Sequence, residues 1–473
     1  MQSGRHDNPI QSGSIVAALA NNAIGIHNFE TGRKSGIKLK NGHLARFLFP
    51  RLKRDRKMRP TKFTKPLLTV VLFSLLAGAT AFAQTHGSVL FALAPYPNCG
   101  APLAPLIADK HGNLYGTTLS GGEANDGCVF ELSPSATGWQ ETTLYAFSGV
   151  DGNGPRASLT LDGVGNLYGT TAEGGTYNRG VAFELSPASG GSWAETVLHD
   201  FGGEGDAAQP ECNLVFDRQG NLYGTTTAGG AYGNSGTVFK LSPSSGGWTE
   251  TILHSFQGGI SGPRPINPLG GLVMDRESHL YGVASFGGEY GGGAVFELSP
   301  SFGTTFAERV IHNFSTDGSN PSSLAMDKSG NLYATTEFGG LGFGTVIELT
   351  KQANGSWGEN VLHMMNGNDG FWVVGPVVFD KEGNLYAAAY LGAINGMGSV
   401  FMLSPTQSGP WTETVLHRFD FQFPDGKDGW GPHAGVIIHN SKLFGTTSGG
   451  GINNDGIVFE IAPSHPETPL SPQ

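Results

Sequence analysis

Short runs in which apolar and polar residues alternate follow one another along most of the chain, and one run keeps returning. It reads Gly-Asn-Leu-Tyr-Gly-Thr-Thr at residues 112–118, 165–171 and 220–226, with weaker copies at 279–284, 330–336, 383–389 and 442–447. Its aromatic residue recurs at intervals of 52 to 58 residues: Tyr115, Tyr168, Tyr223, Tyr281, Tyr333, Tyr386 and Phe444. Seven copies of a short alternating strand at this period predict a β-propeller.

Each repeat divides into four predicted strands, here called a to d. Strand a is apolar and usually ends in Asp, as at 213–217, and a turn that commonly carries Gly-Asn joins it to strand b, the Leu-Tyr-Gly-Thr-Thr run. We expect the Asp to accept hydrogen bonds from the turn and Gly or Asn to adopt positive φ. Strand c reads Gly-x-Val-Phe-x-Leu, and the Ser-Pro after it predicts a turn, because proline is tolerated just outside a strand. Strand d begins with an aromatic residue and Glu and ends near Val-Leu-His-x-Phe.

The two ends of the repeat region predict how the ring closes. Strands a, b and c each occur seven times, but no strand d follows the last strand c at 457–461. A lone apolar strand at 88–93 stands before the first repeat. The predicted fold is therefore an all-β, seven-bladed propeller over residues 88–463, in which this N-terminal strand completes the C-terminal blade. Such closure removes two exposed sheet edges.

The segments outside the repeats have a different composition. Met58 is followed by three bases, an apolar run over 67–79 and Ala-Phe-Ala at 81–83, which predicts a signal peptide over 58–83 cleaved after Ala83. The alternative is an uncleaved membrane anchor over 67–83. Residues 1–57 are basic and without pattern, and are interpreted as a disordered extension or as the product of a misassigned start codon. The Pro-rich residues 464–473 are expected to be disordered.

Composition narrows the class of partner. Residues 1–83 carry 14 basic and three acidic side chains, so the remainder has 14 basic against 36 acidic ones. An acidic body argues against nucleic acid as a partner, and acidity also keeps a secreted protein soluble. Cys99, Cys128 and Cys212 allow at most one disulfide and have no metal-binding spacing. We expect no metal, no cofactor and a monomer.

The repeat resembles a known family. Copies of Gly-Asn-Leu-Tyr-Gly-Thr-Thr, a following Gly-Gly, and Gly-Thr-Val-Phe-Lys-Leu at 236–241 are similar to the GloVer tandem-repeat family of bacterial secreted proteins. The resemblance covers residues 88–463 and implies an extracellular repeat protein held by one of several C-terminal anchors. The period, the Gly-Gly and the Trp near strand d are also similar to kelch-type propeller repeats, though less specifically.

Residues repeated in every blade are poor candidates for chemistry. Strand d carries His199, His254, His312, His363 and His417, which should be spaced too widely around the rim to share a metal ion. The repeated Glu of strand d is expected to bond turn backbone. No G-x-S-x-G, H-E-x-x-H, EF-hand or Walker sequence occurs. We therefore predict no catalytic residue.

Departures from the repeat are better candidates. The b–c and d–a loops of a propeller open on one face, and two Trp residues outside the repeat positions fall in consecutive d–a loops. Aromatic and carboxylate side chains can bind a sugar ring by stacking and hydrogen bonding. The predicted ligand-binding residues are Asp369, Phe371, Trp372, Phe421, Phe423, Asp425, Asp428 and Trp430. The alternative is that these rings plug the channel or pack on one another.

Taken together, the sequence predicts a secreted or cell-surface binding module without catalysis. Its expected partner is an extracellular polysaccharide or another surface protein, and a membrane only if 67–83 is retained. The competing hypothesis is an extracytoplasmic carbohydrate-active enzyme or lyase that uses the same loop face.

Overall fold

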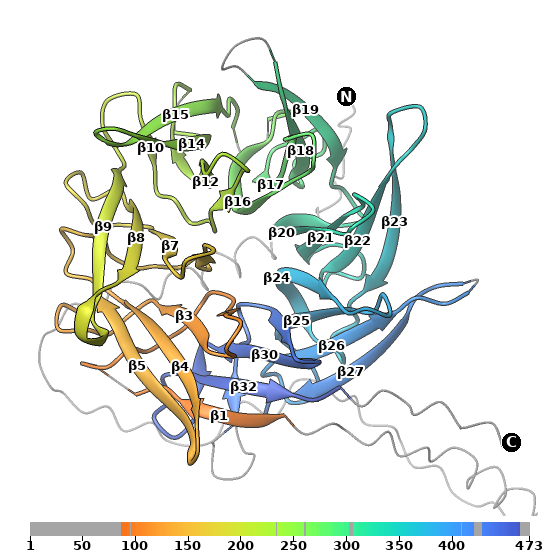
Figure 1. Ribbon diagram of the computed structural model, residues 1–473. Helices are drawn as coiled ribbons and strands as arrows, with labels where there is room; N and C mark the ends of the chain where they lie inside the picture. Colours follow the sequence, from red (N-terminus) through yellow and green to blue (C-terminus); the bar gives the residue numbers. More distant parts are fainter. Residues whose placement is uncertain are drawn as a thin grey trace, which may run out of the picture. The chain divides into compact units, whose positions relative to one another are not determined.

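The computed structural model describes residues 87–463 apart from Pro95, Gly233, 260–261, 302–305, Ser408 and 421–427. The described residues form seven four-stranded antiparallel sheets set around a ring (Figure 1). The predicted all-β, seven-bladed propeller is therefore confirmed. The predicted extension, signal peptide and C-terminal tail lie outside the described residues.

The first four blades are made of strands that follow one another in the chain. Their bounds are, for blade 1, β2 (Ile107–Ala108), β3 (Leu114–Thr118), β4 (Cys128–Ser135) and β5 (Gly138–Ala146); for blade 2, β6 (Thr160–Leu161), β7 (Leu167–Thr171), β8 (Val181–Pro187) and β9 (Trp193–Asp200); for blade 3, β11 (Val215–Phe216), β12 (Leu222–Thr226), β14 (Thr237–Ser244) and β15 (Gly247–Ser255); for blade 4, β16 (Ile266–Met274), β17 (Leu280–Phe286), β18 (Ala294–Pro300) and β19 (Phe306–Asn313).

The remaining blades and two short ribbons complete the architecture. They are, for blade 5, β20 (Ser319–Met326), β21 (Leu332–Phe338), β22 (Thr345–Lys351) and β23 (Trp357–Met364); for blade 6, β24 (Phe371–Phe379), β25 (Leu385–Leu391), β26 (Ser399–Ser404) and β27 (Thr412–Arg418); for blade 7, β29 (Val436–His439), β30 (Lys442–Thr447), β32 (Ile457–Ile461) and β1 (Ser88–Ala92); and for the ribbons, β10 (Ala207–Ala208) with β13 (Ala228–Gly229) and β28 (Gly429–Trp430) with β31 (Gly449–Gly450).

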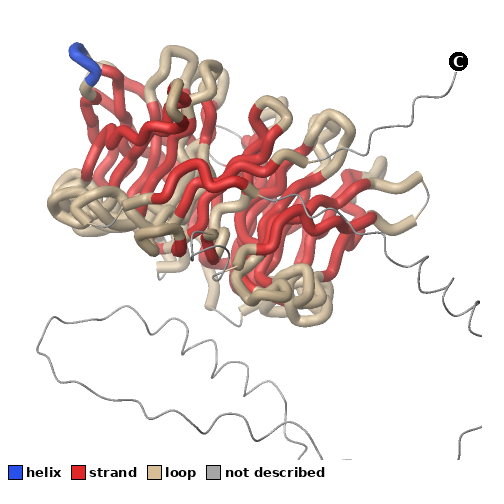
Figure 2. Tube along the Cα trace, turned by 90° about the horizontal axis from the view of Figure 1, so that it is seen from below, coloured by secondary structure: helices blue, strands red, loops and turns tan. Residues whose placement is uncertain are grey.

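Strand a lies toward the centre of the ring and strand d at its outer side (Figure 1), with loops at both ends of the strands (Figure 2). The one helical segment in the described part is the 3-10 turn η2 (Ser189–Gly191). Among these residues no helix has the length and apolar character needed to cross a membrane.

Close packing within a blade explains the glycine of the strand b sequence. A Cβ atom added to Gly169 would lie 2.5 Å from the ring of Phe183 on the neighbouring strand c, which is too close for any side chain. Between blades, the Trp that opens strand d packs edge-on against the strand b Tyr of the preceding blade. Trp193 and Trp248 do so against Tyr115 and Tyr168, with ring centroids 6.5 Å apart in both cases.

The ring closes as the sequence predicts. In blade 7, β1 pairs antiparallel with β32, and Ser88 lies opposite Glu460 while Ala92 lies opposite Ile457. A disulfide between Cys99 and Cys128 then ties the segment that follows β1 to strand c of blade 1. Cys212 is buried and free.

Two local predictions had different outcomes. The Asp after strand a does hold the a–b turn: Asp217 accepts hydrogen bonds from the amides of Gln219 and Asn221 at 2.8 and 2.9 Å. The prediction of a turn at Ser-Pro was wrong, because Pro243 lies within β14, opposite Trp248 of β15. Strand b no longer pairs with β14 at this point, so the proline lies at a sheet position that is paired on one side only, where it is tolerated.

Candidate functional site

The d–a loop of each blade ends against the b–c loop of the preceding blade, so both loops lie on one face as predicted. In all seven blades a residue with φ between +54° and +67° lies before strand a or, in blades 4 to 6, at its second position, and its amide donates to a b–c carbonyl oxygen at 2.8–2.9 Å. These residues are Ala101, Gly154, Gln209, Asn267, Asn320, Trp372 and Gly431. This repeated left-handed residue allows equivalent positions of the seven loops at the mouth of the channel to be aligned and compared.

Blade 6 has a different type of residue at this aligned position, Trp372. The other six blades use Ala, Gly, Gln or Asn, followed by Pro, whereas blade 6 has Trp372 followed by Val373. A bulky side chain at φ +61° is a true conformational outlier, and such strain costs about 1–3 kcal/mol. Since small or amide side chains serve in the other six blades, the backbone alone does not require a tryptophan.

Trp372 belongs to a continuous row of rings, here called the aromatic arc: Phe338, Trp372, Tyr390 and His433. The Trp372 ring is stacked on Tyr390, with centroids 6.2 Å apart and planes 9° from parallel. Phe338 meets Trp372 edge-on at 5.8 Å, and Tyr390 meets His433 edge-on at 5.2 Å. The arc thus runs over blades 5, 6 and 7 on the loop face.

Charged or ionisable side chains lie two residues after the left-handed residue in blades 2, 3 and 7. Arg156 and Glu211, each directly after the proline of its loop, form a salt bridge of 3.2 Å between blades 2 and 3. Burial raises the pKa of Glu211, although the charge of Arg156 opposes this. His433 holds the same position in blade 7; solvent reaches its ring, yet desolvation by the surrounding protein lowers its pKa, and the charge of Arg156 acts in the same direction. The mouth therefore combines aromatic surface with hydrogen-bonding and charged groups.

The residues predicted to bind ligand are divided by the structure. Phe371 and Trp430 are half-buried on the loop face, and Phe371 meets Trp372 edge-on at 5.4 Å. Asp369 and Asp428 are only 3% and 6% exposed and do not lie on the rim. Phe421, Phe423 and Asp425 lie outside the described residues.

Asp369 and Asp428 instead belong to a set of junctions between blades. Asp369 Oδ2 lies 2.9 Å from Nε2 of His363, and Asp428 Oδ2 lies 3.2 Å from Nε2 of His417. Asp206 and Asp317 bond His199 and His312 in the same way, and Asp151 accepts a short hydrogen bond from Tyr145. The Asp of the d–a loop therefore holds the strand d His or Tyr of the blade before it.

The repeated Glu of strand d also lies at these junctions, so the expectation that it bonds turn backbone was wrong. Glu250, Glu308 and Glu359 approach His199, His254 and His312 of the preceding blade at 3.9, 3.6 and 4.0 Å. One oxygen of Glu250 is buried without a hydrogen-bond partner. Strand d packs against the next strand d, and the Glu therefore meets a side chain 47 to 54 residues earlier in the chain instead of its own turn.

Proton affinities differ sharply within a junction. Burial, together with a hydrogen bond and charge from Asp206, raises the pKa of Glu250 to about 9. Burial acts on Asp206 too, but hydrogen bonds from His199 and Glu250 outweigh it and lower the pKa to about 2. Of these two carboxyl groups, Glu250 therefore holds a proton more tightly than Asp206 does.

Among the residues that the structure describes, three groups bring one possible metal-ligand atom per residue within 4.8 Å of one another. They are His199 with Asp206 and Glu250, His312 with Asp317 and Glu359, and Asp275 with Glu277 and His279. In each group the His and Asp are already hydrogen-bonded to one another, at 3.2, 2.9 and 2.8 Å. These hydrogen bonds are sufficient to explain why the side chains of each group lie close together.

The opposite mouth of the ring carries a feature that the sequence analysis missed. Where strand a ends in Asp, the next residue is an exposed base in five blades: Lys110, Arg218, Arg276, Lys328 and Lys381. The a–b turns of blades 3 to 5 line a depression of about 950 Å³ there. The recurrence of Lys or Arg directly after this Asp was visible in the sequence.

Comparisons with known proteins agree with this architecture. The profile of the Gloeobacter/Verrucomicrobia repeat matches residues 71–275 and 267–470, which confirms the resemblance found in the sequence. No curated protein matches.

Among solved structures, the extracellular domain of a candidate one-component system from B. thetaiotaomicron aligns over 80% of this chain with a TM-score of 0.51 and 9% identity. This chain spans 40% of that structure, and the likeness concerns the fold alone. A gluconolactonase from Xanthomonas campestris has 14% identity over 66% of this chain and 89% of its own, with a TM-score of 0.38, which is too low to support an argument.

Proposed function

The chain belongs to the Gloeobacter/Verrucomicrobia repeat family, and we propose that this member is an extracytoplasmic binding module that holds a carbohydrate on the aromatic arc at the mouth of its channel. The observation that carries the proposal is Trp372, which keeps a strained left-handed backbone and stacks on Tyr390. Strain of this kind is maintained where a side chain serves a function.

The chemistry of the mouth suits a sugar. The apolar face of a pyranose ring stacks on an aromatic ring, while its hydroxyl groups need hydrogen-bonding partners at the edge. Trp372 and Tyr390 supply the rings, and Arg156, Glu211 and His433 supply donors and acceptors across the mouth. Asp369 and Asp428 do not enter the proposal, because both are used within the junctions.

An extracytoplasmic location is supported by the Cys99–Cys128 disulfide, since disulfides persist in oxidising compartments. The predicted signal peptide over 58–83 leads to the same location. The proposed partner is accordingly an extracellular polysaccharide or the glycan of a surface protein.

The test is a glycan array probed with the purified protein, followed by titration calorimetry with the best ligand. Replacing Trp372 with Asn, the residue at this position in blades 4 and 5, should weaken binding at least about tenfold through loss of stacking. Trp430→Ala tests the neighbouring d–a loop in the same assay.

Tyr290→Ala is the matched control, because Tyr290 is an exposed aromatic residue of a b–c loop that does not belong to the arc. Unchanged affinity of Trp372→Asn, or equal losses in both variants, would contradict the proposal. The enzymatic alternative would be recognised in the same samples by the release of reducing ends or unsaturated products.

A further inference from the structure

The junction between blades 3 and 4 differs at one position from the five junctions that hold an Asp there. Five d–a loops carry the junction Asp three residues before the left-handed residue: Asp151, Asp206, Asp317, Asp369 and Asp428. In the loop that enters blade 4 the left-handed residue is Asn267, and the residue three positions earlier is Arg264. The sign of the charge is therefore reversed at this junction.

The rest of the junction is kept. His254 still occupies the strand d position of blade 3, and Glu308 still faces it from blade 4, with His254 Nε2 3.6 Å from Glu308 Oε2. Arg264 does not bond the histidine; its Nη1 donates to Oε1 of Gln257 at 2.8 Å. A histidine that has a carboxylate from its d–a loop in four other blades thus lacks one here, among the residues that the structure describes.

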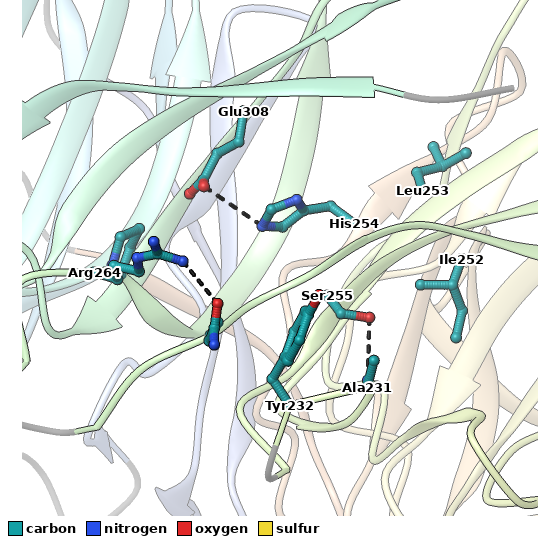
Figure 3. Close-up of a pocket in the computed structure, with 10 residues that line it drawn as sticks. Ala231, Tyr232, Ile252, Leu253, His254, Ser255, Arg264 and Glu308 are labelled. Atoms are coloured by element: carbon teal, nitrogen blue, oxygen red, sulfur yellow. Dashed lines mark hydrogen bonds and ion pairs between the residues drawn. The ribbon is translucent and has the colours of Figure 1, made fainter. Parts of the chain in front are cut away.

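A cavity occupies the place of the missing carboxylate. It measures about 390 Å³, and its polar lining includes His254, Ser255, Gln257, Arg264 and Glu308. Figure 3 shows Arg264, Glu308 and His254 around a common space, with the Tyr232 ring below them. This volume lies in the range of about 300–1,000 Å³ found for small-molecule sites, and Tyr232 is 50% exposed and offers a ring face.

We propose that this cavity, here called the Arg264 pocket, binds a small carboxylate ligand of the hexuronic acid class. The ligand carboxylate would occupy the place that an aspartate fills at neighbouring junctions, between His254 and the guanidinium of Arg264. Arginine presents a planar pair of donors that matches a carboxylate. Tyr232 and the polar groups of Ser255 and Gln257 are available to the sugar ring.

Electrostatics at the pocket favour an anion. Burial lowers the pKa of His254, because desolvation disfavours the charged imidazolium. Burial raises the pKa of Glu308, an effect that the charge of Arg264 opposes. Compared with a junction that holds Asp, this one has gained two units of positive charge, and a bound carboxylate would return one negative charge to it.

The experiment uses titration calorimetry of the purified protein with sodium glucuronate and sodium galacturonate, with glucose as the neutral probe. We expect a uronate to bind and glucose to bind at least about tenfold more weakly, because glucose lacks the charge-assisted pair. A uronate-terminated oligosaccharide, added in a second arm, distinguishes a free acid from the end of a polysaccharide.

Arg264→Asp restores the residue of the other junctions and should abolish uronate binding while the melting temperature stays the same or rises. If Arg264→Asp does not fold, Arg264→Gln tests the same prediction, because it removes the guanidinium charge without adding a carboxylate. Arg276→Gln, which removes an exposed arginine at the opposite mouth of the ring, is the matched control and should leave uronate affinity unchanged. Equal binding of glucose and uronate, retained affinity in both Arg264 variants, or no binding of any uronate at millimolar concentration would overturn the inference.

Discussion

The junction aspartates should stabilise the ring through their charge, and Asp317 offers the cleanest test. Its carboxylate lies 2.9 Å from Nε2 of His312 and accepts hydrogen bonds from the amide and hydroxyl of Ser315, both at 2.9 Å. Burial by itself would raise the pKa of Asp317, but these hydrogen bonds outweigh it and lower the pKa from 3.8 to about 2. The substitution Asp317→Asn removes the charge and preserves the size of the side chain.

The pKa difference sets the expected magnitude. A carboxyl group with a pKa of 3.8 when unfolded and about 2 when folded contributes about 2.5 kcal/mol above pH 4, and this contribution is lost as the pH falls through 2. Burial and the charge of Asp317 raise the pKa of the neighbouring Glu359, so removing that charge returns part of the energy. We therefore expect Asp317→Asn to lower the free energy of unfolding by about 2 kcal/mol at pH 7 and by about half as much at pH 3.

The assay is urea unfolding followed by tryptophan fluorescence and circular dichroism at both pH values. The same substitution in a His312→Asn background is the control, because the effect of Asp317 should shrink when its partner is absent. A loss of stability that is equal at pH 3 and pH 7, or that is undiminished in the His312→Asn background, would refute the electrostatic reasoning.

Three further perturbations test other parts of the structure. Trp372→Asn should change the free energy of unfolding by less than about 1 kcal/mol, because relief of the left-handed strain offsets lost ring contacts, whereas Trp357→Ala, at the repeat position, should cost about 3 kcal/mol or more; equal urea midpoints for the two variants would contradict this. Cys99→Ser should lower stability by about 3.5 kcal/mol through loss of the constraint on the unfolded chain, and a reducing agent should bring the wild-type protein to the same urea midpoint. Deletion of 87–93 should expose the edge of β32 and produce oligomers in light scattering; a stable monomer would count against β1 as an essential part of blade 7.

Much of the fold was predictable because it follows from local pattern and from counting. Strand b is buried along its whole length in blade 1, as at β3, and its alternating sequence repeats with little change. The closure by β1 followed from one surplus strand at the start and one missing strand at the end. Such inferences need no knowledge of which side chains meet.

The junctions were not predictable in the same way, because their members come from different blades. Asp-Gly in a d–a loop reads as a turn, and only the folded chain brings Asp369 to His363 and Glu413 to the same junction. The left-handed residue that aligns the seven loops is also a conformational feature, so Arg264 could be matched with the junction aspartates only after φ was known. Trp372 could be singled out from the sequence because it departs from the repeat in residue type, and its part in ligand binding stays a prediction.

The pairing of β1 with β32 decides how the ring responds to a pull on its ends. Ser88 lies opposite Glu460, so the start of β1 and the end of β32 lie at the same end of their ladder. Tension applied there would peel the ladder open one hydrogen bond after another, like a zipper, instead of shearing all bonds together. The disulfide between Cys99 and Cys128 would then carry the tension and stop the separation of strands at blade 1. The β1–β32 pair would therefore open at low force and form again when the force is removed.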